Sequence, residues 1–296
     1  MESIINYFYN LNPENLKERF GGLLFNVNED RYLLCEVIQD PEVVIKIYNH
    51  LIQNKIGNFM IINNRNNEMI SIQEEKKYVL FKIRCIEDDT LTLNESINIR
   101  ISGNSIWSKI WSERIDYYEI QINELGQNKW IVLNSVNYYI GLAENAIAIA
   151  NKFESTLTEK DYAIQHYRMN VPIKKGYYFN PNNMLIDIAV RDVAEYIKSS
   201  FFNNSREVSL YTNYITSLLL DDKMANLLLA RLLYPSYYFD LFDDIILNEK
   251  KEEELIEIIR EHQKFESFLR EVYVKLSIKH NMVYINWLKK ETKALH

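Results

Sequence analysis

The apolar pattern of this chain changes from strand-like to helix-like near residue 85, and this change constrains the fold more than any other feature. The first part holds five short apolar runs, at 21–27, 31–38, 58–62, 69–73 and 77–84. Polar, turn-prone residues separate most of them, as expected for consecutive strands. One helix interrupts the series, because Asp40 and Pro41 are a typical N-cap and first helical residue, and apolar residues then recur at helical spacing until Gly57. The predicted order is two strands, a helix and three strands.

Beyond residue 85 the apolar spacing is that of helices. Residues 105–124, with Ser105 as N-cap, carry a predicted apolar stripe of Ile106, Ile110, Trp111, Ile115, Tyr118 and Ile122. Further helices are predicted at 128–153, 191–202, 206–220, 223–234, 250–277 and 281–294. Residues 160–188 are expected to be irregular and to end in an apolar, strand-like run closed by Asp187.

These patterns predict an α+β, protein kinase-like fold of two lobes. Residues 1–85 are expected to form a small five-stranded antiparallel sheet with one helix, and residues 86–296 a large, mainly helical lobe.

Glycine is scarce, with 7 in 296 residues, against a usual frequency of about 7%. The adjacent pair Gly21-Gly22 belongs to no GxGxxG or GxxxxGK[ST] pattern, which excludes a Rossmann fingerprint and a Walker loop at the level of motifs.

The charge and hydropathy of the chain limit its expected partners and its expected location. The 34 basic and 41 acidic residues give a net charge of −7, so nucleic acid is not an expected partner. The N-terminal segment lacks the apolar core of a signal peptide, and no run approaches the ~18 apolar residues of a transmembrane segment. We therefore expect an intracellular protein, with Cys35 and Cys85 reduced and buried.

A phosphotransferase of this architecture needs a strand lysine for the phosphates, a central-loop aspartate for the hydroxyl and a second aspartate for Mg²⁺. Cys35 occupies the inward strand position, and a thiol cannot pair with phosphate as an ammonium does. In His166-Tyr167-Arg168, arginine occupies the place of the loop aspartate and cannot act as a base. We expect His166 to organise the turn by hydrogen bonding, and Arg168 to pair with a carboxylate such as Asp187 or to bind an anion.

Asp187 suits a Mg²⁺ ligand, because it closes the apolar run Met184–Ile186. It could equally cap the next helix or pair with Arg168. Asn182 and Asn183, just upstream, could add an oxygen ligand or could simply belong to a turn.

Four segments resemble the spore coat-associated YutH family, which is similar to the CotS spore coat proteins and, more remotely, to aminoglycoside phosphotransferases and choline kinases. These segments are IWSKIWSER at 106–114, YYIGLAENAI at 138–147, VRDVAEYI at 190–197 and ARLLYPSYYF at 230–239. The resemblance implies a two-lobed kinase-like fold and a role in endospore formation. It implies other spore coat proteins as partners, and a location first in the mother-cell cytoplasm and then in the spore coat.

The resemblance also shows which catalytic positions are altered. In the HGDxxxxN motif of active relatives, His166 matches the histidine, Arg168 replaces the aspartate and Ile173 stands in place of the asparagine. Asp187 matches the first aspartate of an IDFD-like motif, and Asp192 resembles the structural aspartate that begins the next helix and anchors the central loop.

We therefore predict a degenerate kinase-fold protein of the spore coat, with no catalytic residues and no cofactor. The alternative is an active ATP- and Mg²⁺-dependent phosphotransferase for small molecules, with Asp187 holding the metal and another carboxylate, such as Asp161, as base. Nucleotide binding without transfer is a third possibility.

Overall fold

The computed structural model of the chain describes residues 1–84, 89–92, 95–124, 128–203 and 208–289. Its residues form two compact units. The first unit contains Met1–Asn104 and Glu159–Ala189, and the second contains Ser105–Thr158 and Val190–His296. The first unit thus combines the N-terminal lobe expected at residues 1–85 with the loop-rich centre of the chain.

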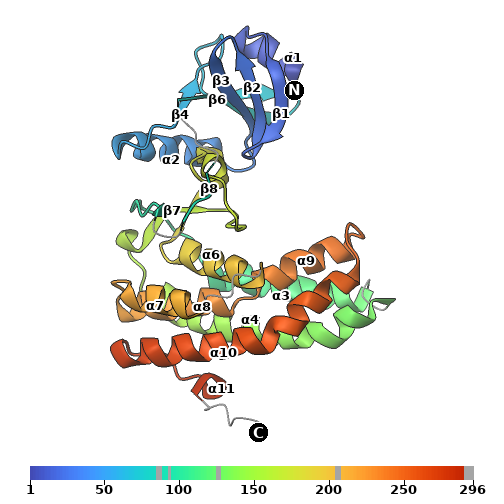
Figure 1. Cartoon of the computed structure of the whole chain (residues 1–296), viewed down its shortest axis with the longest axis vertical. Helices are drawn as coiled ribbons and strands as arrows, with labels where there is room; N and C mark the ends of the chain where they lie inside the picture. Colours follow the sequence, from blue (N-terminus) through green and yellow to red (C-terminus); the bar gives the residue numbers. More distant parts are fainter. Residues whose placement is uncertain (85–88, 93–94, 125–127, 204–207, 290–296) are drawn as a thin grey trace. The chain divides into compact units, whose positions relative to one another are not determined.

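The first unit contains a six-stranded antiparallel sheet (Figure 1). Its strands are β1 (Glu14–Arg19), β2 (Gly22–Val27), β3 (Asp30–Glu36), β4 (Phe59–Ile62), β5 (Ser71–Gln73) and β6 (Lys76–Ile83). Strands β1, β2, β3, β6 and β4 lie side by side in that order, and β5 also pairs with β6. The prediction of five strands missed β1. All six of its residues are exposed, so it lacks the alternation that marks a half-buried strand.

Side chains that alternate along the strands form apolar clusters on both faces of this sheet. Leu33 and Cys35 belong to one cluster, and Tyr32 and Leu34 belong to the other. The short helical segments α1 (Glu2–Ile4) and η1 (Ile5–Tyr9) contribute to the second cluster.

Helix α2 (Pro41–Gln53) begins as the sequence predicted. The Asp40 side chain accepts a hydrogen bond from the backbone N–H of Glu42, and Pro41 is the first helical residue. Its buried residues Val44, Ile47 and Leu51 face apolar clusters of the first unit.

The centre of the chain contains a β-hairpin that was expected to be irregular. Strand β7 (Tyr162–His166) pairs antiparallel with β8 (Met184–Ile188). Three short helical segments adjoin the two strands: η4 (Glu159–Asp161), α5 (Lys175–Tyr178) and η5 (Pro181–Asn183). Ile164 and Met184 from the hairpin pack against Ile47 and Leu51 of α2, which fixes the hairpin within the first unit.

The second unit is helical. Its helices are α3 (Trp107–Glu124), α4 (Trp130–Glu154), α6 (Arg191–Phe202), α7 (Val208–Ser217), α8 (Asp222–Leu233), α9 (Ser236–Ile246), η6 (Glu252–Glu254), α10 (Leu255–Lys279) and α11 (Asn286–Lys289). The long helix α10 packs against α4, α6, α7, α8 and α9 (Figure 1). Most of these helices were predicted within a few residues, whereas α9 was not. Residues 290–294 of the predicted last helix lie outside the described residues, as does Cys85. None of the described helices is both long and apolar enough to span a bilayer.

The residues of the predicted apolar stripe lie on two different faces of helix α3, one buried and one exposed. Trp107, Trp111, Ile115 and Tyr118 are buried, but Ile106 and Ile110 are 49% and 53% exposed. The stripe prediction was therefore wrong for these two isoleucines. The Glu154 carboxylate accepts hydrogen bonds from the backbone N–H groups of Trp107 and Ser108, which satisfies donors that begin every helix.

Candidate functional site

The turn between β1 and β2 is a two-residue hairpin loop formed by Phe20 and Gly21. Arg19 pairs with Gly22 across it, and φ is +57° at Phe20 and +82° at Gly21, as in the type I′ turn favoured by hairpins. A left-handed non-glycine residue costs about 1–3 kcal/mol. The Phe20 ring is only 6% exposed, and its burial compensates for this strain.

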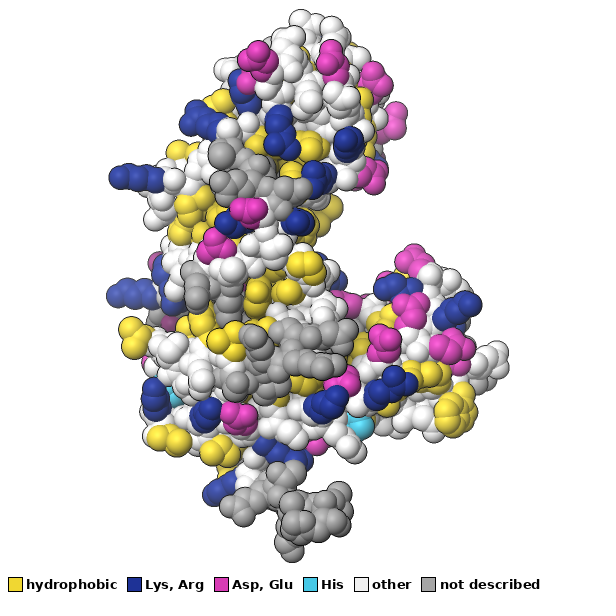
Figure 2. Space-filling model, in the orientation of Figure 1, with side chains coloured by type: hydrophobic (Ala, Val, Ile, Leu, Met, Phe, Trp, Pro, Cys, Tyr) yellow, Lys and Arg dark blue, Asp and Glu magenta, His cyan; other side chains and the backbone are white. Residues whose placement is uncertain are grey.

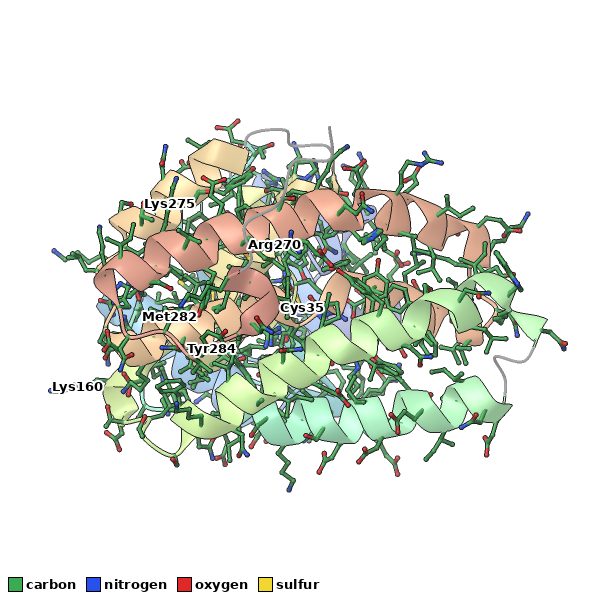
Figure 3. The ribbon with its side chains drawn as sticks, turned by 90° about the horizontal axis from the view of Figure 1, so that it is seen from below. Cys35, Lys160, Arg270, Lys275, Met282 and Tyr284 are labelled. Carbon is green, nitrogen blue, oxygen red and sulfur yellow. The ribbon has the colours of Figure 1, made fainter. Side chains whose placement is uncertain are left out.

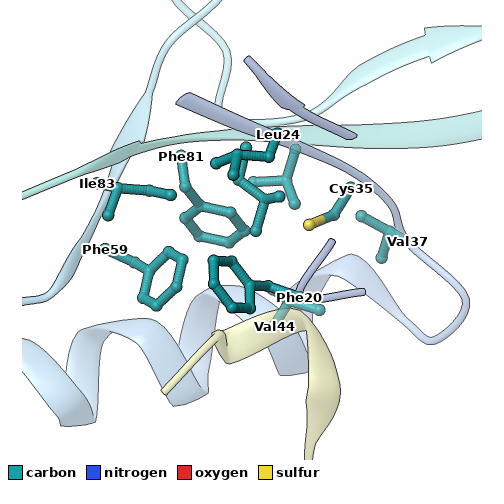
Figure 4. Packing of buried hydrophobic residues seen from close by; sticks show 10 residues of the cluster. Phe20, Leu24, Cys35, Val37, Val44, Phe59, Phe81 and Ile83 are labelled. Atoms are coloured by element: carbon teal, nitrogen blue, oxygen red, sulfur yellow. The ribbon is translucent and has the colours of Figure 1, made fainter. Parts of the chain in front are cut away.

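The Phe20 ring packs against the segment that precedes β8. A Cβ at Gly176 would lie 2.5 Å from Cε1 of the ring, so the ring lies directly over the backbone of α5. Phe20 belongs to an apolar cluster with Phe59 and Phe81 (Figure 4). Tyr177 and Phe179 pack against the same cluster. The hairpin turn is therefore attached to the centre of the chain by a buried aromatic side chain.

Three asparagines at 180–183, which we call the asparagine turn, hold the sheet through side-chain amides. The carbonyl oxygen of Phe20 accepts hydrogen bonds from Nδ2 of Asn180 at 2.9 Å and from Nδ2 of Asn183 at 3.0 Å. Asn183 also donates to the carbonyl of Tyr177 at 2.9 Å, and Asn182 donates to the carbonyl of Glu36 at 3.1 Å. All three asparagines are buried, so these bonds are shielded from water and leaving one unmade is costly.

Cys35, predicted from the sequence to replace the strand lysine of a phosphotransferase, is completely buried on β3. Nδ2 of Asn180 lies 3.4 Å from its sulfur as a hydrogen-bond donor. Burial raises the pKa of the thiol to about 12, although the Asn180 amide acts in the opposite direction. The thiol is thus protonated at neutral pH and neither binds anions nor acts as a nucleophile.

His166, at the end of β7, is completely buried. Its Nε2 lies 2.8 Å from the carbonyl oxygen of Tyr178, and its ring stacks on the Tyr178 ring with centroids 4.1 Å apart. These contacts tie the end of β7 to α5 and suit a histidine that organises the loop.

Arg168, two residues further on, is exposed. Its charge lowers the pKa of the Tyr177 phenol, which burial raises by a larger amount. Arg168 thus lies near the residues that pack under the Phe20 turn, and its permanent charge excludes the role of a general base.

Asp187 is a buried residue within β8 rather than at its end. Its Oδ1 accepts a hydrogen bond of 2.7 Å from the backbone N–H of Ile188. Asp187 pairs with Ala163, whereas His166 pairs with Met184, so the two residues lie about 10 Å apart along the hairpin at ~3.3 Å per residue. In the described part of the chain, no cluster of three or more His, Cys, Asp or Glu side chains is arranged to hold a metal ion.

Two further carboxylates were considered from the sequence. Asp161 is buried, and its carbonyl accepts a hydrogen bond from Ala189, so it lies beside the end of β8 that follows Asp187. Asp192 is buried in the first turn of α6, in the second unit. Its predicted anchoring of the central loop stays a prediction.

The second unit contains a buried ion cluster of Glu195, Lys198 and Arg231. Oε1 of Glu195 lies 2.9 Å from Nζ of Lys198 and 2.5 Å from Nε of Arg231, and the Arg231 guanidinium lies over the Trp107 ring at 5.1 Å. Burial raises the pKa of Glu195, but Lys198 and Arg231 together lower it well below its ordinary value. The cluster joins α6 to α8 and stabilises the helical unit.

Sequence reasoning missed the contacts that dominate this region. The sequence indicates a turn at residues 180–183, and it suggests a role for the Asn182 and Asn183 side chains only as a source of an oxygen ligand for a metal. Their partners Phe20 and Glu36 lie 146–163 positions earlier in the chain, and no local pattern reveals pairings at such a separation. A phenylalanine directly before Gly21-Gly22 was the one available signal of an unusual turn.

Two solved structures place the chain in a fold class. An aminoglycoside phosphotransferase from Alicyclobacillus acidocaldarius subsp. acidocaldarius DSM 446 is similar with a TM-score of 0.60 and 8% identity, covering 91% of this chain and 94% of that one. A spectinomycin phosphotransferase in complex with ADP and spectinomycin has a TM-score of 0.54 and 10% identity, covering 93% and 97%. The predicted kinase-like fold, with a sheet-containing N-terminal lobe and a mainly helical C-terminal lobe, is thereby confirmed.

Within this class, the family is also shown. A family model described as "Spore coat putative kinase YutH" matches residues 2–272, so the chain belongs to this family and the resemblance seen in the sequence is confirmed. The endospore coat-associated protein YutH of Bacillus subtilis (strain 168) is 24% identical over 210 residues, which cover 62% of this chain. The match spans 61% of that relative, less than two thirds of its length.

Proposed function

We propose that this protein is a non-catalytic kinase-fold component of the bacterial spore coat, with a structural or interaction role. Family membership supports the coat context. The absence of phosphotransfer is inferred from the residues of the first unit, where the chemical requirements of phosphotransfer can be compared with the contacts present.

One observation carries the proposal: a single amide, Nδ2 of Asn180, contacts both the Phe20 carbonyl at 2.9 Å and the Cys35 sulfur at 3.4 Å. In kinases, the phosphates lie between the turn that Phe20 occupies here and the strand lysine that Cys35 replaces. A nucleotide bound in that way would have to break the hydrogen bonds to Phe20 and displace its buried ring. Exposing such a ring alone costs about 1.5–3 kcal/mol, and no ammonium at position 35 would compensate.

The residues at the expected catalytic positions also support a protein without phosphotransfer activity. Arg168 cannot accept a proton, and a positioned general base commonly contributes about 10²–10⁴ in rate. Asp187 would supply one carboxylate to Mg²⁺, but its Oδ1 already accepts the N–H of Ile188. A protein with these residues is expected to retain the fold without the transfer reaction, and no cofactor is required for that role.

Nucleotide binding is tested by thermal unfolding of the intact chain with and without Mg-ATP. We expect equal midpoints for the wild type, and no effect of nucleotide in Asp187→Ala. A shift in the wild type that is lost in Asp187→Ala would instead indicate nucleotide binding at β8. Transfer of phosphate to a small hydroxyl compound would establish the alternative, an active phosphotransferase, and Asp161→Asn would then test the base.

The coat role is tested in an endospore-forming cell that produces the chain as a fluorescent fusion. We expect fluorescence first in the mother-cell cytoplasm and then around the developing spore, where other coat proteins are the proposed partners. Fluorescence that stays uniformly distributed through spore maturation would contradict this role, whatever the result with Mg-ATP.

A further inference from the structure

Helix α3 carries a second apolar stripe on its outer face, opposite the side that packs in the helical unit. This α3 stripe consists of Ile106, directly before the helix, and Ile110, Tyr117 and Ile120 within it. These four side chains are 49%, 53%, 47% and 54% exposed. In Figure 3, α3 lies at the edge of the helical unit beside α4, with side chains projecting away from it.

The spacing within the α3 stripe is that of a helix–helix contact. Successive members are four, seven and three residues apart, so they follow a heptad with Glu113 at the one polar position. Surface apolar residues are ordinary when scattered, but a continuous stripe at heptad spacing is typical of a groove or seam for another helix.

Charges around the α3 stripe restrict what can cover it. The exposed charged residues of α3 on the side of the stripe are Lys109, Glu113, Asp116 and Glu124, one cation against three carboxylates. Lys109 lies 3.9 Å from Glu113 on the same helix, and Arg114, the other cation beside the stripe, is already paired with Asp243 of α9. On the face drawn in Figure 2, by contrast, acidic and basic side chains are interspersed.

The helix that carries the stripe is held firmly on its inner side. Arg114 donates to Asp243 of α9 at 2.6 Å, and the Trp111 ring stacks on Tyr234 with centroids 4.4 Å apart. The Glu154 carboxylate caps its first turn. A preorganised surface of this kind loses little conformational entropy on binding.

We propose that the α3 stripe is a docking surface for an amphipathic helix of another protein, whose apolar stripe is flanked by lysine and arginine. A second copy of this chain is disfavoured, because it would place two acidic faces together and like charges across an interface repel. The proposal concerns the second unit alone, so it stands whether or not nucleotide binds in the first unit and wherever the protein is located.

The test uses two synthetic 21-residue helical peptides with leucine at the a and d positions of three heptads. One carries lysine at the flanking e and g positions, and the other carries glutamate. Fluorescence anisotropy with the full chain is expected to show binding of the lysine peptide at least about tenfold tighter than that of the glutamate peptide, with an affinity that falls as salt rises.

The decisive variant is Ile110→Glu combined with Tyr117→Glu, which makes the surface more acidic while removing its apolar contacts. We expect it to lose binding of the lysine peptide. The matched control is Val274→Glu combined with Ile278→Glu, which adds the same charge at apolar positions of α10 that are 52% and 78% exposed, and it should bind as the wild type does. Equal loss in both variants, or loss in neither, would overturn the proposal.

A second pair of substitutions keeps the test decisive if the first variant folds poorly. Asp116→Lys with Glu124→Lys changes only exposed positions on the side of the stripe and should reverse the preference between the two peptides. An unchanged preference would contradict the proposal. Sedimentation equilibrium of the chain alone is expected to show a monomer, and a dimer that Ile110→Glu with Tyr117→Glu abolishes would assign the α3 stripe to a second copy instead.

Discussion

Replacing Gly176 by alanine is expected to destabilise the first unit, because the new methyl group would enter space that the Phe20 ring occupies. The Cβ would lie 2.5, 2.6 and 2.7 Å from three ring carbons, closer than any ordinary contact. Inserting a methyl group into a packed site costs about 1–3 kcal/mol, and the helical preference of alanine over glycine returns about 0.5–1 kcal/mol. The expected net loss is about 0–2.5 kcal/mol, with a central value of about 1 kcal/mol.

Two comparisons separate this effect from a general effect of alanine. Gly141→Ala in α4 is the control for the effect of alanine in a helix: nothing lies within 4 Å of its Cβ, and we expect stabilisation of about 0.5–1 kcal/mol. Because α4 lies in the second unit, this control is measured by tryptophan fluorescence during unfolding. In a Phe20→Ala background the obstructing ring is gone, so Gly176→Ala should lose its penalty. A double-mutant cycle measures this coupling.

The assay must report on the first unit. All four tryptophans, at 107, 111, 130 and 287, lie in the second unit, so their fluorescence follows the wrong part of the molecule. Hydrogen–deuterium exchange of the β2 and β3 amides under native conditions measures local opening of the sheet. The reasoning fails if Gly176→Ala exchanges as slowly as the wild type, or if its penalty persists in the Phe20→Ala background.

Three further predictions follow from single groups. Burial raises the folded-state pKa of Cys35 to about 12. The contribution of its protonated thiol to folding stability is therefore complete below the unfolded pKa of about 8.5 and declines as pH rises toward 12. Mass spectrometry should find the Cys35 peptide unalkylated by iodoacetamide at pH 8 until the chain is denatured. Glu195→Gln leaves Lys198 and Arg231 buried without their counter-charge and should cost about 3–5 kcal/mol, seen by tryptophan fluorescence during unfolding. Since the folded-state pKa of Glu195 is lowered, its contribution is present above the ordinary value near 4.3 and lost as pH falls, so the variant should lose less stability on acidification than the wild type. Glu154→Ala leaves the first N–H groups of α3 without their acceptor and should cost about 0.5–2 kcal/mol; an unchanged melting temperature would refute the capping role.

Local patterns were sufficient for many elements that have a distinct inner and outer face, although they missed α9. The start of α2 at Asp40 and Pro41, the strands β2 and β3, and most of the later helices follow from capping residues and apolar spacing. The same reasoning missed β1, whose residues are all exposed, because nothing in the sequence of a fully exposed strand distinguishes it from a loop.

For the candidate site, too, some features follow from the sequence and others only from the tertiary structure. The sequence alone determined which groups are present: a thiol at Cys35, a guanidinium at Arg168 and a carboxylate at Asp187. Only the tertiary structure decided that the Asn180 amide joins the Phe20 carbonyl to the Cys35 sulfur and that α3 presents a second apolar stripe outward. A hydrogen bond between residues some 160 positions apart depends on how the rest of the chain folds. The same is true of which face of a helix is buried, because this depends on what packs against each side. A one-dimensional pattern does not contain that information.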